Sequence, residues 1–258
     1  MSRFAVILPA AGSSSRFGMR QKKPFVDLKG RAVWIRSLEP FATRDDVVQS
    51  LVVVAAEDIE DFKDRFKADL PFLDVELVVG GATRADSVAN GLAAVRDDVE
   101  FVAVHDAARP LVAEAWIDEV FAAATKYGAA IPAVRISSTL KREDADGTVQ
   151  ETVSRDGLWA AQTPQVFRRD VLMEAYAARG DVESTDEAQL VERIGHPVRL
   201  VEGAPMNIKI TNQADLDMAR LLLRAVPQDD LLDRLHPFSE VDPKSIRDVG
   251  LDFDSLVD

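Results

Sequence analysis

The sequence contains no cysteine among its 258 residues and only three histidines. The absence of cysteine excludes disulfide bonds, thiol catalysis and cysteine-ligated metal sites. The histidines, His105, His196 and His236, lie far apart in the chain and lack the paired spacing of a histidine-built zinc site. A metal ion in this protein would therefore be a hard cation that is bound by oxygen atoms.

Long apolar segments and an excess of basic residues are also missing. No segment approaches the roughly 18 apolar residues of a membrane span, and the apolar run near the N-terminus is too short for a signal peptide. Lysine and arginine number 31 against 44 acidic residues, and the formal net charge of -13 argues against general affinity for nucleic acid. We therefore expect a cytoplasmic protein without nucleic-acid or membrane partners, in which an anionic substrate would need a local basic pocket.

The chain alternates apolar, β-branched segments with segments of helical periodicity. Predicted strands cover residues 4–8, 48–56, 75–79, 101–104 and 129–134, and predicted helices cover residues 32–41, 59–66, 85–95 and 114–127. This alternation predicts βαβ units, and hence an α/β fold with a mostly parallel sheet and helices on both faces. Further along we expect a loop at residues 160–166, helices near residues 168–178, 186–194 and 213–224, and a strand at residues 198–202.

Residues 135–156 interrupt this alternation. They are polar, and two strand-like segments, 137–141 and 148–154, flank the turn signal Asp146-Gly147. An isolated hairpin is marginally stable in water, so we expect it to pack against a partner subunit. The alternative is a mobile surface insertion.

The last part of the chain differs in composition from the rest. Residues 225–258 carry nine acidic and three basic residues, and three prolines interrupt them. Such a segment is expected to be partly ordered at most. The predicted organisation is therefore one domain over residues 1–224 with a β-arm at about 135–156, followed by an acidic tail over residues 225–258.

Three loops that carry polar or small residues each follow a predicted strand: residues 9–16, 80–87 and 105–110. Ligands in parallel α/β sheets bind at the carboxyl ends of the strands, so the three loops predict one shared site.

The first loop consists of Pro9, Ala10, Ala11, Gly12 and three serines, and it ends at Arg16. Small side chains let backbone N–H groups approach an anion, and the Arg16 guanidinium suits phosphoryl oxygens. Lys23 could supply a second cation. The loop lacks the glycines of a Walker loop or of the dinucleotide fingerprint, and an ordinary strand-to-helix turn is the alternative.

The second loop begins with two glycines, and Thr83 and Asp86 then have the spacing of a helix capping box. Glycines here let a flat base lie against the backbone, and Ser87 could hydrogen-bond the edge of a base. The alternative is a glycine turn before a capped helix.

The third loop places Asp106 at the end of a predicted strand, where its carboxylate could bind Mg²⁺, and Arg109 where it could meet an anion. A phosphate-binding loop together with such an aspartate is the minimum set for Mg²⁺-assisted nucleotidyl transfer. We expect His105 to have a packing role. Lys209 lies in a segment with strand character, residues 207–211, and its ammonium group must point to a defined place.

Eight motifs resemble, in order and spacing, those of the 2-C-methyl-D-erythritol 4-phosphate cytidylyltransferases of the non-mevalonate isoprenoid pathway. They are AVILPAAGSSSRFG, KKPF, GGATRADSV, VHDAARPLV, STLKR, TVSRDGLWAAQTPQVF, STDEAQLVE and NIKIT. The resemblance covers residues 4–224 and implies a Rossmann-like catalytic domain, with a β-arm that interlocks the two subunits of a homodimer.

The same resemblance implies the substrates and their binding residues. CTP, the co-substrate, would lie on Pro9, Ala10, Ala11, Gly12, Gly81, Arg84, Asp86 and Ser87, with Arg16 and Lys23 on its phosphates. Asp106 would bind Mg²⁺. Methylerythritol phosphate would be held by Asp106, Arg109, Thr163, Thr185 and Lys209, with Thr139 and Arg155 reaching over from the partner's arm. The residues expected to act in catalysis are Arg16, Lys23, Arg155 and Lys209.

Two positions depart from the family pattern. Pro24 follows Lys23 where the family often has glutamine, and Met206 stands where some members have an acidic residue. Asp106 and the triphosphate would therefore hold the metal ion without a second carboxylate. Two alternatives are a ribitol-5-phosphate cytidylyltransferase, which would share the CTP site, and a non-catalytic nucleotide-binding dimer, which the presence of Arg16, Lys23 and Asp106 disfavours.

Overall fold

The computed structural model describes residues 2–12 and 25–227. The chain divides into one unit over residues 1–226 and a C-terminal segment over residues 227–258. Arg16, Lys23 and the predicted acidic tail from residue 228 onward lie outside the described residues.

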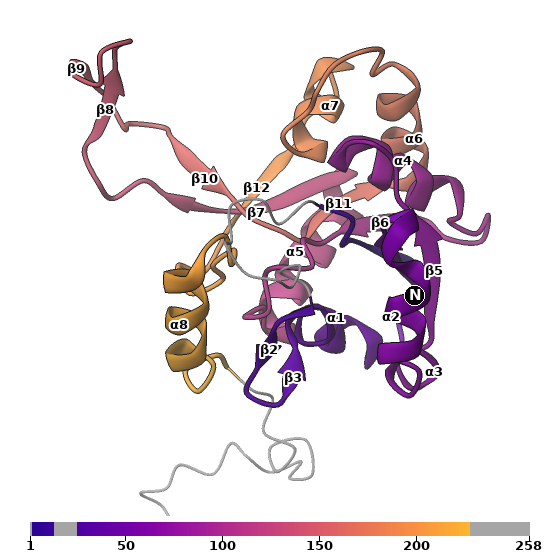
Figure 1. Cartoon of the computed structure of the whole chain (residues 1–258). Helices are drawn as coiled ribbons and strands as arrows, with labels where there is room; N and C mark the ends of the chain where they lie inside the picture. Colours follow the sequence, from indigo (N-terminus) through magenta and orange to yellow (C-terminus); the bar gives the residue numbers. More distant parts are fainter. Residues whose placement is uncertain (1, 13–24, 228–258) are drawn as a thin grey trace, which may run out of the picture. The chain divides into compact units, whose positions relative to one another are not determined.

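A mixed sheet, eight-stranded within the described residues, forms the centre of the first unit (Figure 1). Its strands are β1 (Phe4–Pro9), β4 (Val47–Val54), β5 (Val75–Val79), β6 (Phe101–Val104), β7 (Ala129–Arg135), β10 (Trp159–Ala161), β11 (Gln165–Arg168) and β12 (Arg199–Glu202). The strand order is β10-β7-β11-β6-β1-β4-β5, with β12 also paired to β7. The pairs β6-β1, β1-β4, β4-β5 and β12-β7 are parallel, whereas β11 runs antiparallel to β6 and β7, and β10 antiparallel to β7.

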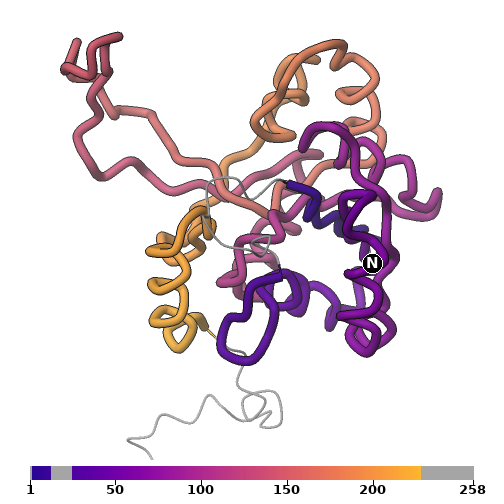
Figure 2. Tube along the Cα trace, in the orientation of Figure 1, coloured from indigo at the N-terminus to yellow at the C-terminus, as the bar shows by residue number. Residues whose placement is uncertain are grey.

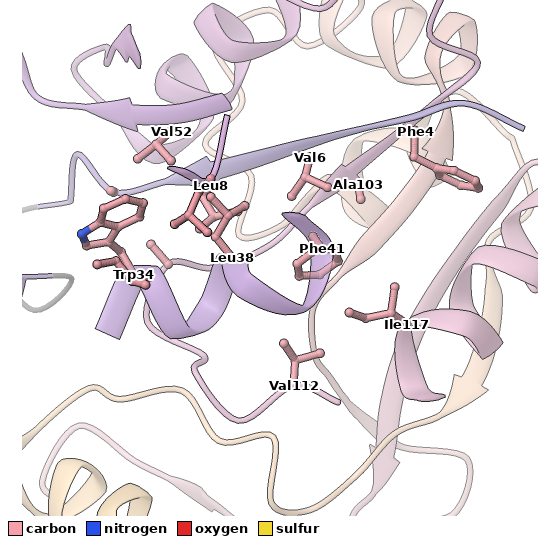
Figure 3. Packing of buried hydrophobic residues seen from close by; sticks show 14 of the residues in the cluster. Phe4, Val6, Leu8, Trp34, Leu38, Phe41, Val52, Ala103, Val112 and Ile117 are labelled. Carbon is pink, nitrogen blue, oxygen red and sulfur yellow. The ribbon is translucent and has the colours of Figure 1, made fainter. Parts of the chain in front are cut away.

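Successive side chains of β1 point to opposite faces of the sheet, as strand geometry requires. Phe4, Val6 and Leu8 belong to one buried cluster, whereas Ala5 and Ile7 belong to another. Figure 3 shows the first of these clusters, in which the β1 side chains meet residues of two helices. A strand that is apolar at every position is therefore buried on both faces.

Helices cover both faces of the sheet, which confirms the predicted fold class. The helices are α1 (Val33–Ala42), α2 (Ile59–Arg65), α3 (Asp69–Phe72), α4 (Arg84–Ala93), α5 (Glu114–Tyr127), α6 (Arg169–Ala177), α7 (Glu187–Arg193) and α8 (Gln213–Leu222), with a short 3₁₀ turn at Ala56–Asp58. Helices α1, α2 and α5 contribute to the first cluster, and α4, α6 and α7 contribute to the second. Asn212 caps α8, and it forms a capping box with Asp215.

Two sequence predictions about local structure were wrong. Residues 160–166 were expected to form a loop, but β10 and the beginning of β11 occupy much of this segment. These strands are three and four residues long, too short to show an alternating pattern, and the antiparallel β11 inserts between β6 and β7. Residues 207–211 form no strand; Ile210 N–H instead donates to the carbonyl of Ala108.

The predicted hairpin exists and forms an arm. Strands β8 (Leu140–Glu143) and β9 (Val149–Val153) pair with each other in a two-stranded sheet of their own, and their side chains are mostly exposed. Gly147 adopts a positive φ of 79° in the connecting turn. Figures 1 and 2 show the arm extending away from the main sheet beyond β7 and β10. A further small pair, β2 (Asp27–Leu28) and β3 (Arg31–Ala32), precedes α1.

Candidate active site

A cavity of about 710 Å³ lies at the carboxyl ends of parallel strands. Its walls come from the loops that follow β1, β4, β5 and β6, together with one segment near the C-terminus of the domain. The lining includes Pro9, Ala10, Ala11, Gly12, Gly80, Gly81, Arg84, Ser87, Asp106 and Lys209. The described parts of all three loops that were singled out in the sequence therefore meet at one cavity.

The glycine loop after β5 is held by hydrogen bonds at both ends. Gly80 N–H donates to the carbonyl of Val54, and Gly81 N–H donates to Ser87 Oγ over 3.1 Å. Close packing leaves no room for a side chain at Gly81, because a Cβ there would lie 2.3 Å from Cβ of Asp86. The loop backbone thus lies directly against the first turn of α4.

The predicted capping box at the start of α4 is present. Thr83 Oγ accepts from Asp86 N–H, and the Asp86 carboxylate accepts from Thr83 N–H. The same carboxylate forms an ion pair of 2.5 Å with Arg179, which with the capping bonds holds the pKa of Asp86 below its usual range. Asp86 is therefore occupied in fixing the loop and the helix, whereas its neighbour Arg84 faces the cavity.

Asp106, directly after β6, lies among three cationic groups. The closest is Lys209 Nζ, 2.9 Å from Oδ2, followed by Arg109 Nε at 3.4 Å and Arg84 Nη2 at 3.5 Å. Burial raises the pKa of Asp106, but the charges of Lys209, Arg84 and Arg109 outweigh it and hold the pKa well below its usual range. The carboxylate is therefore ionised inside a basic pocket on an otherwise acidic protein.

A buried hydrogen-bond chain positions the Asp106 backbone. Asp106 N–H donates to Thr163 Oγ, and that hydroxyl bonds His105 Nδ1 at 3.1 Å. His105 Nε2 lies 3.1 Å from the Arg109 carbonyl, which can only accept, so Nε2 carries the proton and Nδ1 accepts from Thr163. Burial lowers the pKa of His105 to about 4, and its ring packs against Phe41. This neutral, packed side chain agrees with the structural role predicted for it.

A second cavity of about 160 Å³ adjoins the first and shares Arg84, Asp106 and Lys209 with it. Its lining also includes Arg109, Thr163 and Thr185, so five of the residues predicted to hold the acceptor meet here. Arg109 is fixed by a hydrogen bond of 2.8 Å from Nη1 to the carbonyl of Asn207. The three shared residues mark the junction of a large and a small compartment.

Two predicted acceptor residues lie elsewhere. Thr139 and Arg155 flank the arm strands, and the Arg155 guanidinium donates to the carbonyl of Ser137 within the arm. Figure 1 shows the arm well away from the carboxyl ends of β1 and β6 in the same subunit. The predicted roles of Arg16 and Lys23 fall outside the described residues.

Sequence reasoning missed Glu187, which lies behind Arg84. Its side chain is fully buried, and its carboxylate pairs with the Arg84 guanidinium over 2.7 and 3.0 Å. Gln165 supports the same helix start, because its Oε1 accepts from the N–H groups of Glu187 and Ala188. The available signal was the acidic residue in the first turn of a predicted helix, which is common and does not indicate burial.

The oxygen atoms available at the site can be compared with the ligands that Mg²⁺ prefers. Within residues 2–12 and 25–227 no cluster of three acidic, histidine or cysteine side chains could hold a metal ion. Mg²⁺, however, is usually bound by one or two carboxylates together with waters and substrate phosphates. Asp106 supplies one ionised carboxylate at the cavity, and among the described residues its Oδ1 has only a long contact of 3.5 Å with Arg84. The residues therefore fit an ion that is held jointly by Asp106 and a bound triphosphate.

No helix in the described part of the chain is long and apolar enough to cross a membrane.

Comparison with known proteins identifies the family. Residues 4–225 match the family model described as IspD, 2-C-methyl-D-erythritol 4-phosphate cytidylyltransferase. The chain is 44% identical to the protein of that name from Rhodopirellula baltica over 85% of this chain and 94% of the relative, and 46% identical to that from Frankia casuarinae over 88% and 84%.

Solved structures agree with this assignment. The crystal structure of 2-C-methyl-D-erythritol 4-phosphate cytidylyltransferase from Thermus thermophilus matches with a TM-score of 0.71 and 35% identity, over 87% of this chain and 100% of that chain. The crystal structure of a 4-diphosphocytidyl-2C-methyl-D-erythritol synthase matches with a TM-score of 0.74 and 32% identity, over 86% and 100%. The chain, with its paired cavities around Asp106, belongs to the 2-C-methyl-D-erythritol 4-phosphate cytidylyltransferase family.

Proposed function

We propose that this protein transfers CMP from CTP to 2-C-methyl-D-erythritol 4-phosphate, giving 4-diphosphocytidyl-2-C-methyl-D-erythritol and pyrophosphate, a step of isoprenoid precursor biosynthesis. The observation that carries the proposal is the junction of two cavities at Arg84, Asp106 and Lys209. Nucleotidyl transfer needs two anionic reactants whose phosphates meet at one point. Two adjoining compartments that share two cationic side chains, Arg84 and Lys209, provide such a point.

The larger cavity is suited to the nucleotide. Small residues after β1 and the Gly80-Gly81 backbone after β5 leave room for a flat base and a phosphate chain. We assign the triphosphate to residues 9–12 and to Arg16 and Lys23, which the sequence places directly downstream. The base lies along Gly81 and Ser87 in this proposal.

The smaller cavity is suited to the acceptor. Arg109 and Lys209 supply positive charge for its phosphate, and Thr163 and Thr185 line the same cavity. A phosphate oxygen of the acceptor attacks the α-phosphorus of CTP in line. The bond from this phosphorus to the oxygen bridging to the β-phosphate breaks, and pyrophosphate leaves with the electron pair. No covalent enzyme intermediate is required.

Catalysis in this proposal consists of positioning and charge neutralisation. Arg16 and Lys23 stabilise the charge on the departing pyrophosphate, and Lys209 and Arg155 orient the acceptor phosphate. Asp106 would hold Mg²⁺, which neutralises phosphate charge when it is bound. The low pKa of Asp106 supports this role, because the carboxylate stays ionised near neutral pH.

The test is release of pyrophosphate from CTP with methylerythritol phosphate as acceptor. Ribitol 5-phosphate, assayed in parallel, separates this activity from that of the related cytidylyltransferase. We expect turnover with methylerythritol phosphate to exceed turnover with ribitol 5-phosphate. Equal or greater turnover with ribitol 5-phosphate would contradict the proposed acceptor, and CTP binding without turnover of either would favour a non-catalytic dimer.

We further propose that the arm, residues 135–156, crosses to a second subunit in a homodimer, so that Thr139 and Arg155 serve the partner's acceptor site. The exposure of β8 and β9 and their separation from the main sheet support this. Mixing inactive Arg155→Ala subunits with inactive Asp106→Asn subunits tests it. A hybrid dimer has one site with both lesions and one intact site, so activity should recover to about one quarter of wild type at random mixing. No recovery after verified subunit exchange would show that Arg155 acts within its own subunit.

A further inference from the structure

The carboxylate of Glu187 is buried next to the active site, where it contacts Arg84 on the side away from the two cavities. Glu187 opens α7, and its side chain is 0% exposed. Oε1 accepts from Arg84 Nη1 at 2.7 Å and from the Tyr176 hydroxyl at 3.1 Å, and Oε2 accepts from Arg84 Nη2 at 3.0 Å. The three side chains come from α7, α4 and α6, which lie on the same side of the sheet (Figure 1).

Stability alone does not account for this ion pair. Removing two charges from water is costly, and a buried pair often contributes little net stability compared with apolar residues of the same size. Arg84 itself is not sealed off, because it lines both cavities of the active site. The pair therefore joins a buried carboxylate, Glu187, to a guanidinium that faces the two cavities. We call Glu187 the anchor of Arg84.

The anchor competes with Asp106 for the same guanidinium. Nη2 of Arg84 donates to Glu187 at 3.0 Å but reaches Asp106 Oδ1 only at 3.5 Å. Asp106 is already contacted by Lys209 and Arg109. Without Glu187, the remaining carboxylate within reach of Arg84 among the described contacts is Asp106, and a tight Arg84–Asp106 pair would turn the positive charge of Arg84 away from an incoming phosphate.

Burial lowers the pKa of Arg84, but the Glu187 charge and hydrogen bonds outweigh it, so the guanidinium keeps its proton. Tyr176 retains its proton as well, because burial and the neighbouring Glu187 charge raise its pKa. The hydroxyl therefore remains a donor that fixes the Glu187 carboxylate.

We propose that Glu187, held by Tyr176, is a positioning residue that keeps Arg84 directed at the junction of the two cavities for contact with the phosphates of CTP. The identity of the ligand rests on the proposed function. Glu187 touches no reacting atom in this assignment, and its effect on the nucleotide passes entirely through Arg84.

Calorimetric titration of CTP in the presence of Mg²⁺ and the absence of acceptor tests the assignment on the full chain. Glu187→Gln should weaken CTP binding roughly tenfold, the scale of one charge-assisted contact. Tyr176→Phe should weaken it by roughly threefold, because it removes one hydrogen bond to the anchor. Asp217→Asn, which breaks the exposed Asp217–Arg220 pair on α8, is the matched control and should bind CTP like wild type.

A double-mutant cycle distinguishes positioning from a general structural effect. In an Arg84→Met background, Glu187→Gln should produce no further loss of CTP affinity, because the residue through which it acts is gone. The double variant also removes both charges of the pair and leaves no unpaired buried carboxylate, so it remains testable if Glu187→Gln alone does not fold. Tyr176→Phe then serves as the single variant.

Two results would overturn the inference. One is CTP binding by Glu187→Gln, or by Tyr176→Phe if the former does not fold, that equals wild type. The other is a further loss of affinity on adding Glu187→Gln to Arg84→Met. Failure of the proposed function looks different: wild type would then not bind CTP, or would bind it without releasing pyrophosphate in the presence of methylerythritol phosphate.

Discussion

Replacing Gly81 with alanine should damage the nucleotide site through the backbone. A Cβ at this position would lie 2.3 Å from Cβ of Asp86, and 3.0 and 3.2 Å from its backbone C and Cα atoms, whereas ordinary contacts begin at 3.4 Å. The capping box and the Arg179 ion pair hold Asp86 in place. The loop must therefore move by about 1.1 Å relative to α4, the difference between 3.4 and 2.3 Å.

The size of the effect follows from this displacement. Overpacking of this kind costs about 1–3 kcal/mol of folding stability, and each 1 kcal/mol lowers Tm by about 2–4 °C in a protein of this size. Misplacing a binding element by about 1 Å can lower the rate by roughly 10²-fold. We expect kcat/KM for CTP to fall by this order, together with a drop of several degrees in Tm.

The assays are steady-state pyrophosphate release at varied CTP and thermal unfolding without ligand. Gly12→Ala is the control for folding alone, because a Cβ there meets no heavy atom of residues 2–12 and 25–227 within 4 Å and its backbone has no positive φ. Its Tm should equal or slightly exceed that of wild type, since alanine restricts the unfolded chain. A Gly81→Ala variant with wild-type kcat/KM and Tm would refute the packing argument.

Three further predictions concern the site and its surroundings. Lys23→Ala should lower kcat by about 10²-fold, the scale of losing one preorganised charge contact; near-normal kcat in a folded variant would remove Lys23 from the mechanism. Asp106→Asn should lower activity and change its Mg²⁺ dependence, whereas superimposable titration curves with equal rates would contradict the metal assignment. The two tyrosines should differ in their titration, because a hydrogen bond and charge from Lys126 lower the pKa of Tyr127, whereas burial and the Glu187 charge raise that of Tyr176. Absorbance during alkaline titration of the folded protein should show ionisation of Tyr127 alone, Tyr176→Phe should leave this step unchanged, and ionisation of both tyrosines near 10 in the folded protein would be inconsistent with the buried network. Because folded Tyr176 holds its proton to higher pH than the unfolded chain, its contribution to stability is full below pH 10.0 and is lost as pH rises through the folded pKa.

The sequence predicted the features that depend on local pattern. Apolar, β-branched runs of four or more residues predicted β1, β4, β5, β6 and β7, because strands in the middle of such a sheet are rich in apolar residues. Strands β1 and β6 are apolar at every position, whereas β4 and β5 also carry polar residues. The capping box at α4 was predicted from spacing alone, since both partners lie within one helical turn. The meeting of three loops at one cavity was predicted too, because parallel strands end at one edge of the sheet.

Tertiary structure decided the features that depend on partners distant in the chain. Strand β10 has three residues and β11 has four, so their pairing with β6 and β7 is visible only when those strands are in place. Lys209 was expected in a strand, but its position is set by the contact of its ammonium group with Asp106, 103 residues away.

Tertiary structure also decided which charged side chains pair with each other at the site. Arg84 and Glu187 are separated by 103 residues, and their pairing distinguishes an anchored guanidinium from a surface one. An acidic residue in the first turn of a helix is favourable in any exposed helix, so local sequence carries no sign that Glu187 is buried. Sequence by itself determined which residue types reach the carboxyl edge of the sheet. Only the packing of α4, α6 and α7 on the same face of the sheet determined which charges they meet there, because electrostatic partners are set by distance in space and not by distance along the chain.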